Sequence, residues 1–355
     1  MRAEVARDAA VHGRYGSSAI APSAGMPELE MNRGLVAVCV TSAIAAGTIA
    51  AARAADWPAK PVRIVSPFAP GGTSDTLGRL LAEQLTDKFG QNFFVENRGG
   101  AGGLIGSAAV ASAEADGSTF LISSIGTHVT SPATSPNPAY DPLRLFTHIA
   151  YLGGPPNVIV VHPSLGVKTF QELLAAAKIG NGVSFISPGP GTIGHLVPEL
   201  LARKANLKFA HVAYKGAGQA MTDLVAGHVK MGSVTWSSAI GQIRAGTVVP
   251  LAVSSARPMP EFPDVPTMKA LGYPELVATT WFGFSGPARV PKDIVTRLNG
   301  EIVAALGIPA MRQRLEAEGI ETEKMSADEF TGFVASEIAR WTPVAKSVAD
   351  SSSTR

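Results

Sequence analysis

The sequence predicts an α/β fold with two doubly wound domains. Its 355 residues, 46% of them hydrophobic and 16% charged, can bury a large core, and at roughly 150 residues per domain the length corresponds to about two domains. From Asp56 onward, apolar runs of strand length alternate with segments of helical periodicity, which is the pattern of βαβ units. Continuous apolar runs such as Phe120-Leu-Ile122 indicate strands that are buried on both faces.

The first half of this pattern predicts three strands and two helices. The strands are expected at 62–68, 92–96 and 119–124, and the helices at 73–89 and 103–115. The proline-rich stretch 131–142 predicts an extended loop, because a residue that precedes proline disfavours the helical conformation. This stretch interrupts the alternation where the rim or lid of a cleft would lie.

A second unit is expected to begin near Val158. Thr169-Phe-Gln-Glu172 is a capping box that opens a helix to residue 178. Further strands are expected at 183–187, 209–214, 229–235 and 249–254, with helices at 192–204, 218–226 and 238–245. Three more helices are expected at 292–306, 309–318 and 327–348.

The terminal helices need another part of the chain to pack against, and the simplest arrangement returns them to the first domain. The chain then crosses between lobes twice, near Val161 and near Trp281. We therefore expect one discontinuous lobe of residues 55–160 and 283–355, and a second lobe of residues 161–282.

Residues 1–54 are expected to be an amino-terminal extension and a signal peptide. Arg33 precedes a run of about 17 apolar or small residues, which is too short and too rich in alanine to span a membrane well. The small residues of Ala52-Arg-Ala54 predict cleavage after Ala54 and export to the periplasm. The start at Met1, Met26 or Met31 stays open, as does a lipoprotein reading of Cys39.

Composition excludes several classes of function. The formal net charge is +2, without basic runs interleaved with aromatic residues, so nucleic acid is not an expected partner. The single cysteine lies in the leader, which leaves the mature chain without a thiol nucleophile or a disulfide. The seven histidines lack the spacing of metal ligands, and common catalytic motifs are missing, so we expect no metal, no cofactor and no enzyme activity.

Glycine-rich turns between strands and helices indicate a site for an anion. In Ala69-Pro-Gly-Gly72, the glycines have no side chain to keep a ligand away and can adopt positive φ, and the following helix start carries partial positive charge. Similar turns recur in Asn97-Arg-Gly-Gly-Ala-Gly-Gly103 and Ser187-Pro-Gly-Pro-Gly-Thr192. Gly189-Pro-Gly-Thr-Ile-Gly194 also matches a dinucleotide fingerprint, but no acid follows the next strand at 213–215, so a carboxylate site or a plain tight turn explains it better.

Several motifs in order resemble one receptor family. They are Trp57-Pro-Ala-Lys-Pro-Val-Arg-Ile-Val-Ser-Pro-Phe-Ala-Pro-Gly-Gly-Thr-Ser-Asp75, Val95-Glu-Asn-Arg-Gly-Gly-Ala-Gly-Gly-Leu-Ile-Gly106, Tyr214-Lys-Gly216, Pro263-Asp-Val-Pro-Thr267 and Trp281-Phe-Gly283. These segments resemble the Bug-type (TctC) extracytoplasmic solute receptors of tripartite tricarboxylate transporters. The resemblance covers about residues 57–348. It implies a two-lobed periplasmic-binding-protein fold, type II-like, in which two doubly wound domains close on a small carboxylate.

The chain departs from the family pattern in its turns and in the second lobe. The usual Pro-Pro-Gly-Gly is Ala69-Pro-Gly-Gly72, the usual Pro-Tyr-Lys-Gly is Ala213-Tyr-Lys-Gly216, and prolines stand in 187–192 where polar residues are common. A common Phe-Asp-Asn-like segment is replaced by Val234-Thr-Trp-Ser-Ser238, which removes an acid from the edge of the cleft. This loss argues against a ligand amino group, whereas Trp236 and Ser233 leave room for an aromatic or hydroxylated acid.

The anion-binding turns and the resemblance together give a set of expected ligand-binding residues. They are Phe68, Ala69, Pro70, Gly71, Gly72, Thr73, Asp75, Ser124, Thr127, Ser187, Gly191, Thr192, His195, Tyr214, Lys215 and Trp236. Alternatives remain for several of them: Asp75 also fits a helix-capping role, His195 a capping and packing role, and Lys215 a solvated surface charge. Trp281 and Phe282 could form the floor of the cleft or belong to the core.

The expected function is that of a monomeric periplasmic receptor which delivers a small carboxylate to the membrane subunits of a tripartite transporter. The resemblance allows di- and tricarboxylates, amino acids and aromatic acids as ligands. An orphan or sensory carboxylate-binding protein of the same fold shares the same site and stays as an alternative. An unrecognised hydrolase or transferase is the third reading, which turnover of a bound acid would support.

Overall fold

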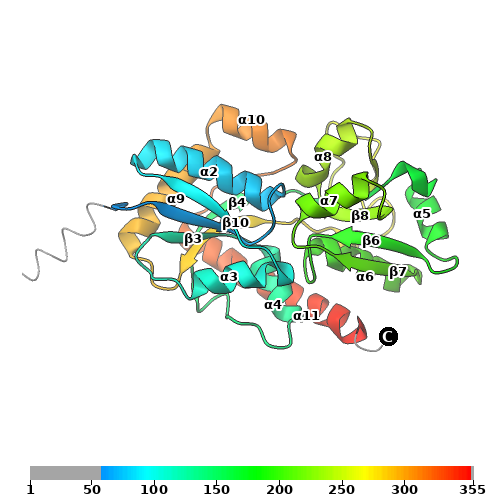
Figure 1. The fold of residues 1–355 in the computed structure, drawn as a ribbon, viewed down its shortest axis with the longest axis horizontal. Helices are drawn as coiled ribbons and strands as arrows, with labels where there is room; N and C mark the ends of the chain where they lie inside the picture. The colour runs from blue at the N-terminus through cyan, green and yellow to red at the C-terminus, as the bar shows by residue number, and fades with distance from the viewer. Residues whose placement is uncertain (1–56, 353–355) are drawn as a thin grey trace, which may run out of the picture. The chain divides into compact units, whose positions relative to one another are not determined.

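The computed structural model describes residues 57–352, which form two lobes with one sheet in each (Figure 1). The expected leader, the cleavage after Ala54, Cys39 and the alternative starts at Met1, Met26 and Met31 lie outside the described residues. In this part of the chain, no single helix is long and apolar enough to cross a bilayer, and only the bent pair Lys292–Leu306 and Pro309–Ala317 has the length and composition to do so.

The sheet of the first lobe has the strand order β2-β1-β3-β10-β4. Its strands are β1 (Val62–Ser66), β2 (Phe93–Asn97), β3 (Thr119–Ser124), β4 (Phe146–Gly153) and β10 (Phe282–Pro287). β1 pairs in parallel with β2 and β3, and β10 runs antiparallel between β3 and β4. The leucines of α2 (Thr73–Phe89) and the apolar residues of α9 (Lys292–Leu306) bury one face, while α3 (Leu104–Ala111) packs against β1 and β3.

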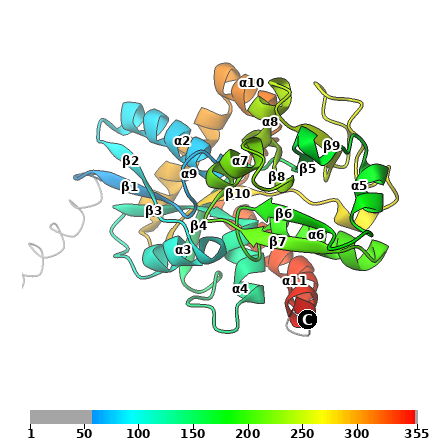
Figure 2. The same ribbon diagram turned by 45° about the vertical axis from the view of Figure 1, so that its right-hand side comes forward.

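The second sheet repeats this plan with the order β7-β6-β8-β5-β9. Its strands are β5 (Asn157–Val161), β6 (Val183–Ser187), β7 (Phe209–Ala213), β8 (Met231–Thr235) and β9 (Val249–Val253). Figure 2 shows β5 between β8 and β9, and it is antiparallel to both. The repeated order means that each sheet contains one antiparallel strand next to its last strand, inserted where the chain has crossed from the other lobe.

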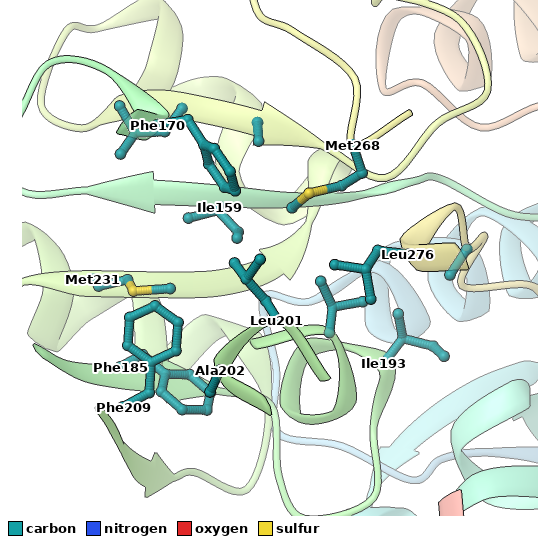
Figure 3. Close-up of a cluster of buried hydrophobic side chains, with 14 of the residues drawn as sticks. Ile159, Phe170, Phe185, Ile193, Leu201, Ala202, Phe209, Met231, Met268 and Leu276 are labelled. Carbon is teal, nitrogen blue, oxygen red and sulfur yellow. The ribbon is translucent and has the colours of Figure 1, made fainter. Parts of the chain in front are cut away.

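Helices cover both faces of the second sheet. α5 (Phe170–Ala176) and α6 (Ile193–Ala205) bury one face, and α7 (Ala217–Val225) and α8 (Trp236–Arg244) the other. Figure 3 shows the first of these cores, where Phe185 and Met231 from the sheet meet Leu201 of α6. The four helices therefore hold the carboxyl ends of β6, β7 and β8 in fixed positions.

The sheets locate the two crossings between lobes. β4 ends at Gly153 and β5 begins at Asn157, so the first crossing lies at 154–156. All of Asn157–Val161 pairs within the second sheet, and Phe282 pairs within the first. The lobe boundaries expected from the sequence lay at 160/161 and 282/283, so each differs from the boundary that the sheets indicate. Strands β4 and β10 have no counterpart in the sequence-based assignment.

One expected loop is partly helical. Residues Gly126–Thr130 form a π-helical turn, η2, and α4 (Ser131–Thr134) continues it, so the prediction of an extended loop throughout 131–142 is wrong for its first four residues. Pro132 stands in the first turn of α4, where its missing N–H group would have no partner within the helix anyway. After α4 the backbone becomes extended at Ser135, as expected.

The last helix connects the two lobes. α11 (Ala327–Ser352) packs on β4 and η2 of the first lobe, as expected for a returning terminal block, and its far end reaches α6 of the second lobe. There Arg203 donates from Nη2 to the carbonyl of Val348 at 2.8 Å, and Leu196 packs with Ala345 and Val348. α10 (Pro309–Ala317) packs on α9 at the back of the first lobe.

Candidate functional site

A small cavity lies between the lobes, at the carboxyl ends of strands from both sheets. Its volume in this form is about 40 Å³. The lining residues come from both lobes and from the second crossing: Phe68, Gly72, Thr73, Ser74, Ser124, Gly126, Asn157, Pro188, Thr192, Ile193, Gly194, Ala217, Thr235, Ser238, Thr280 and Phe282. None of the lining residues in the described part of the chain has a charged side chain.

Four helices point their amino-terminal ends at this cavity. The lining includes the first residues of α2, α6 and α7, which are Thr73, Ile193 and Ala217, and it includes Thr235 and Ser238 at the start of α8. The first N–H groups of a helix have no acceptor within the helix, and the helix dipole adds partial positive charge at the same end. The cavity therefore favours negative charge without a cationic side chain.

In the first lobe, the turn before α2 is ordered by Asp75. Gly71 has a φ of 84°, a conformation that favours glycine, and its N–H donates to Oδ2 of Asp75 at 3.1 Å. Arg79 and Asn97 also donate to this carboxylate, at 3.1 and 3.0 Å. Burial acts to raise the pKa of Asp75, but the hydrogen bonds from Arg79, Asn97 and Gly71 prevail and lower it. Asp75 is thus ionised and orders the turn from behind, which is the helix-capping role that the sequence offered as the alternative to ligand binding.

In the second lobe, two stacked histidines brace the turn before α6. Nδ1 of His195 accepts from the N–H of Gly191 at 3.1 Å, and Nε2 of His211 lies 2.6 Å from the hydroxyl of Ser187. The two rings stack with their centroids 4.1 Å apart. Burial lowers the pKa of His195 to about 4 and that of His211 to about 3, so both are neutral at pH 7.

The lobes touch each other around the cavity. The hydroxyl of Thr73 lies 2.8 Å from that of Thr235, and the N–H of Ala69 donates to the carbonyl of Lys215 at 2.8 Å. On another side, the hydroxyl of Ser131 donates to the carbonyl of Pro190 at 3.2 Å. The structure is therefore a closed form, in which hydroxyl and backbone groups join the lobes.

The structure brings five of the expected ligand-binding residues to the cavity. They are Phe68, Gly72, Thr73, Ser124 and Thr192. A second group lies behind the wall or at the lobe contact and positions the turns: Ala69, Gly71, Asp75, Thr127, Ser187, Gly191 and His195. Thr127 illustrates this role, because its hydroxyl accepts from the N–H of Ser124 at 2.9 Å.

The remaining four expected residues do not line the cavity. Pro70 is exposed on the turn, and the side chain of Lys215 is exposed, with only its carbonyl at the lobe contact. Tyr214 donates its hydroxyl to Asp223. Trp236 is 2% exposed and packs edge-on against Phe262 in the core, so it leaves no aromatic-lined space for a ligand.

Sequence reasoning missed most of the second-lobe wall and the crossing. Asn157 was detectable as a polar residue at the head of the buried run Val158-Ile-Val-Val161, and Thr235 and Ser238 flank the residue that was chosen there, Trp236. Phe282 lines the cavity, while Trp281 is a core residue whose Nε1 donates to Glu337 at 3.0 Å.

Thr280 contributes a hydroxyl from the second crossing. Its Oγ1 is buried, and it has no hydrogen-bond partner in the described part of the chain. A buried hydroxyl without a partner is costly, so this atom is well suited to meet a polar ligand atom or a water in the cavity. Within the same residues, no cluster of three or more histidine, cysteine or acidic side chains is placed to hold a metal ion.

Comparison with known proteins identifies receptors with this architecture. A sequence model described as the tripartite tricarboxylate transporter family receptor, TctC, matches residues 77–349. Protein BugT of Bordetella pertussis is 36% identical over 306 residues, which are 85% of this chain and 94% of that protein.

Solved structures show the same fold. Rpa4515 of R. palustris, solved with adipate, is 34% identical with a TM-score of 0.79, and the match covers 83% of this chain and 98% of that one. MatC of Rhodopseudomonas palustris, with bound malate, is 30% identical with a TM-score of 0.77, and the match covers 81% and 100%. These likenesses confirm the predicted two-lobed α/β architecture of periplasmic binding proteins.

Proposed function

Because the chain belongs to the TctC family of tripartite tricarboxylate transporter receptors, we propose that it captures a small carboxylate in the cavity between its lobes and delivers it to the membrane subunits of such a transporter. The family consists of periplasmic solute-binding receptors and not of enzymes. The observation that carries the proposal is the uncharged cavity on which four helix amino termini converge. Two relatives of known structure hold dicarboxylates, adipate and malate.

Capture depends on backbone and hydroxyl donors. A carboxylate in the cavity would accept from the first N–H groups of α2 and α6 and from hydroxyls such as those of Ser124 and Thr280. Such donors are already oriented by the helices, so little side-chain entropy is lost on binding. Two bodies close to the lobe limits expected from the sequence, 55–160 with 283–355 and 161–282, would open and close, with hinges at the crossings at 154–156 and just before Phe282.

The place of action follows from the family. We propose that the chain is exported to the periplasm and that its leader is removed near Ala54. Amino-terminal sequencing of protein recovered from the periplasm checks this, and an intact leader there would contradict it.

The decisive experiment separates backbone capture from capture by a lysine. Gly72 has extended backbone, with φ −101° and ψ 171°, so the positive φ belongs to Gly71 and a valine at position 72 should fold. A Cβ there would lie 3.6 Å from that of Ala217, and the added methyl groups would fill the cavity and the lobe contact. Gly72→Val should therefore weaken binding at least tenfold, while Lys215→Ala should bind like the wild type.

A thermal-shift screen of a carboxylate library finds the ligand first, since a ligand at 100 times its Kd adds about 2.7 kcal/mol of stability. Titration calorimetry with the best acid then compares the two variants. If Gly72→Val binds normally and Lys215→Ala binds nothing, the anion is held by the lysine and the cavity is not the site. If no carboxylate shifts the melting temperature, the proposed function itself is wrong.

A further inference from the structure

None of the described residues that line the cavity is acidic. Asp75 stands in the first turn of α2, but it does not line the cavity, and its oxygens already accept from Gly71, Arg79 and Asn97. At the corresponding place in the second lobe, the start of α8 supplies the neutral residues Thr235 and Ser238. An ammonium group in this cavity would thus lose its water without meeting a carboxylate.

The helix ends increase this penalty. Each of the four helix amino termini at the cavity adds partial positive charge, which repels a cation as it attracts an anion. The neutral hydroxyls and the amide of Asn157 can accept from an ammonium group, but they provide no compensating charge. The wall therefore distinguishes ligands by charge.

Hydroxyl groups and helix starts line the cavity at two places, which is an arrangement that would suit a ligand with a carboxylate at each end. At the first, Thr73 of α2 meets Thr235, with 2.8 Å between the hydroxyl oxygens, and Ser238 lies beside them. At the second, Ser124 and Gly126 of the first lobe face Thr192 at the start of α6, whose methyl group would lie 3.8 Å from a Cβ on Gly126. Apolar side chains complete the wall, including Phe68 and Phe282.

We propose that the ligand is a dicarboxylate without an ammonium group, and that Asn157 is one of the residues that keep the wall neutral. This inference rests on the proposed function and narrows it. Asn157 is 2% exposed, its Nδ2 donates to the hydroxyl of Ser233 at 2.8 Å, and its N–H donates to the hydroxyl of Ser254 at 2.8 Å. Its amide is thus fixed in the wall at a position where a carboxylate has almost the same shape.

Matched pairs of acids test, on the wild-type protein, whether the cavity rejects a ligand that has an ammonium group. Succinate, glutarate and adipate are each compared by calorimetry with the acid of equal length that carries an α-amino group: aspartate, glutamate and 2-aminoadipate. In every pair that binds, the acid without the amino group should bind at least tenfold more tightly. Equal or tighter binding of the aminated acid overturns the inference but leaves carboxylate capture standing. If none of the six acids binds while another carboxylate does, the dicarboxylate class is wrong.

Asn157→Asp tests the role of the wall itself. The hydroxyl of Ser233 can turn to donate to the new carboxylate, so the fold should be kept. We expect at least tenfold weaker binding of the preferred diacid and a smaller preference over its aminated partner. Gln313→Glu makes the same change of charge on the exposed face of α10, and it should alter neither the affinity for the diacid nor the affinity for its aminated partner.

An Asn157→Asp protein that folds and keeps the wild-type preference removes Asn157 from the inference. If circular dichroism shows that this variant does not fold, the pairs of acids measured on the wild-type protein still decide whether the cavity rejects an ammonium group.

Discussion

His195 and His211 show how single residues behind the wall shape the site. His195 was expected to contact the ligand or to cap a helix, and the structure gives it the second role, since its Nδ1 accepts from the N–H of Gly191. That hydrogen bond requires an unprotonated Nδ1. The charge state of this residue is therefore linked to the stability of the turn.

This link predicts a dependence of stability on pH. In the folded protein burial lowers the pKa of His195 to about 4 and that of His211 to about 3, whereas an unfolded histidine titrates near 6.5. The unfolded chain then binds more protons, so the stabilisation is complete above about pH 6.5 and is lost as the pH falls toward 4. Urea denaturation at pH 7 and pH 5 should show a lower free energy of unfolding at pH 5.

A variant identifies the contribution of this residue. In His195→Asn the side-chain oxygen can accept from the same N–H but does not titrate in this range, so the difference between the two pH values should become smaller. His148 is also buried, with a pKa lowered by burial to about 4, so part of the difference should remain. Equal stability of the wild type at both pH values would contradict the assignment.

The residues that sequence reasoning found are those whose role is local. The helix-capping types at 73–75 and the glycines at 71–72 determine the shape of one turn, and that shape depends on neighbours in the chain. Asn157 and Thr280 were missed because they reach the cavity only through the pairing of β5 with β8 and through the second crossing. Lys215 and Trp236 lie in suitable turns, but their side chains point to solvent and to the core.

At the scale of elements, alternation and capping predicted most strands and helices, because each depends on a short window of sequence. β4 was missed: Phe146–Gly153 includes His148, a polar residue that packs in the interior beside Ser285, 3.3 Å from its hydroxyl. A buried histidine inside a strand weakens the apolar pattern that sequence reasoning requires. The partner strand β10 lies more than 120 residues away, so local sequence does not reveal the pairing.

The turn before α2 gives an element-scale prediction, since its two glycines have different conformations. Gly71 has φ 84° and Gly72 has φ −101°. An alanine at positive φ costs about 1–2 kcal/mol, whereas the extended conformation accepts alanine freely. Gly71→Ala should therefore lower the free energy of unfolding by about 1–2 kcal/mol, and Gly72→Ala should change it little. Denaturant melts of the two variants compare them directly, and equal losses would show that the turn has no such asymmetry.

At the scale of the whole described chain, two doubly wound domains and two crossings between them were expected from length and alternation, whereas the strand order shared by the two sheets was not predicted. The positions of the crossings depend on which sheet accepts the strand Asn157–Val161, and tertiary pairing decides that. The closed cavity follows from the same pairing, because it places the starts of α2 and α8 opposite each other. The sequence pattern alone contains no information on the distance between the starts of α2 and α8.

Closure itself leads to the last prediction. In this form the lobes touch on several sides: a Cβ on Gly218 would clash with the carbonyl of Pro70, and one on Gly102 with that of Pro190. Such contacts narrow the way into the cavity, so we expect the lobes to separate before binding and to close afterwards, with the ligand favouring the closed form by its greater affinity for it. Small-angle scattering of the ligand-free protein should give a larger radius of gyration than scattering with a saturating carboxylate from the screen. An acid that fails to bind in calorimetry serves as the control and should leave the radius unchanged. If the binding acid also leaves it unchanged, the lobes do not move on binding, and the hinges proposed at the crossings are wrong.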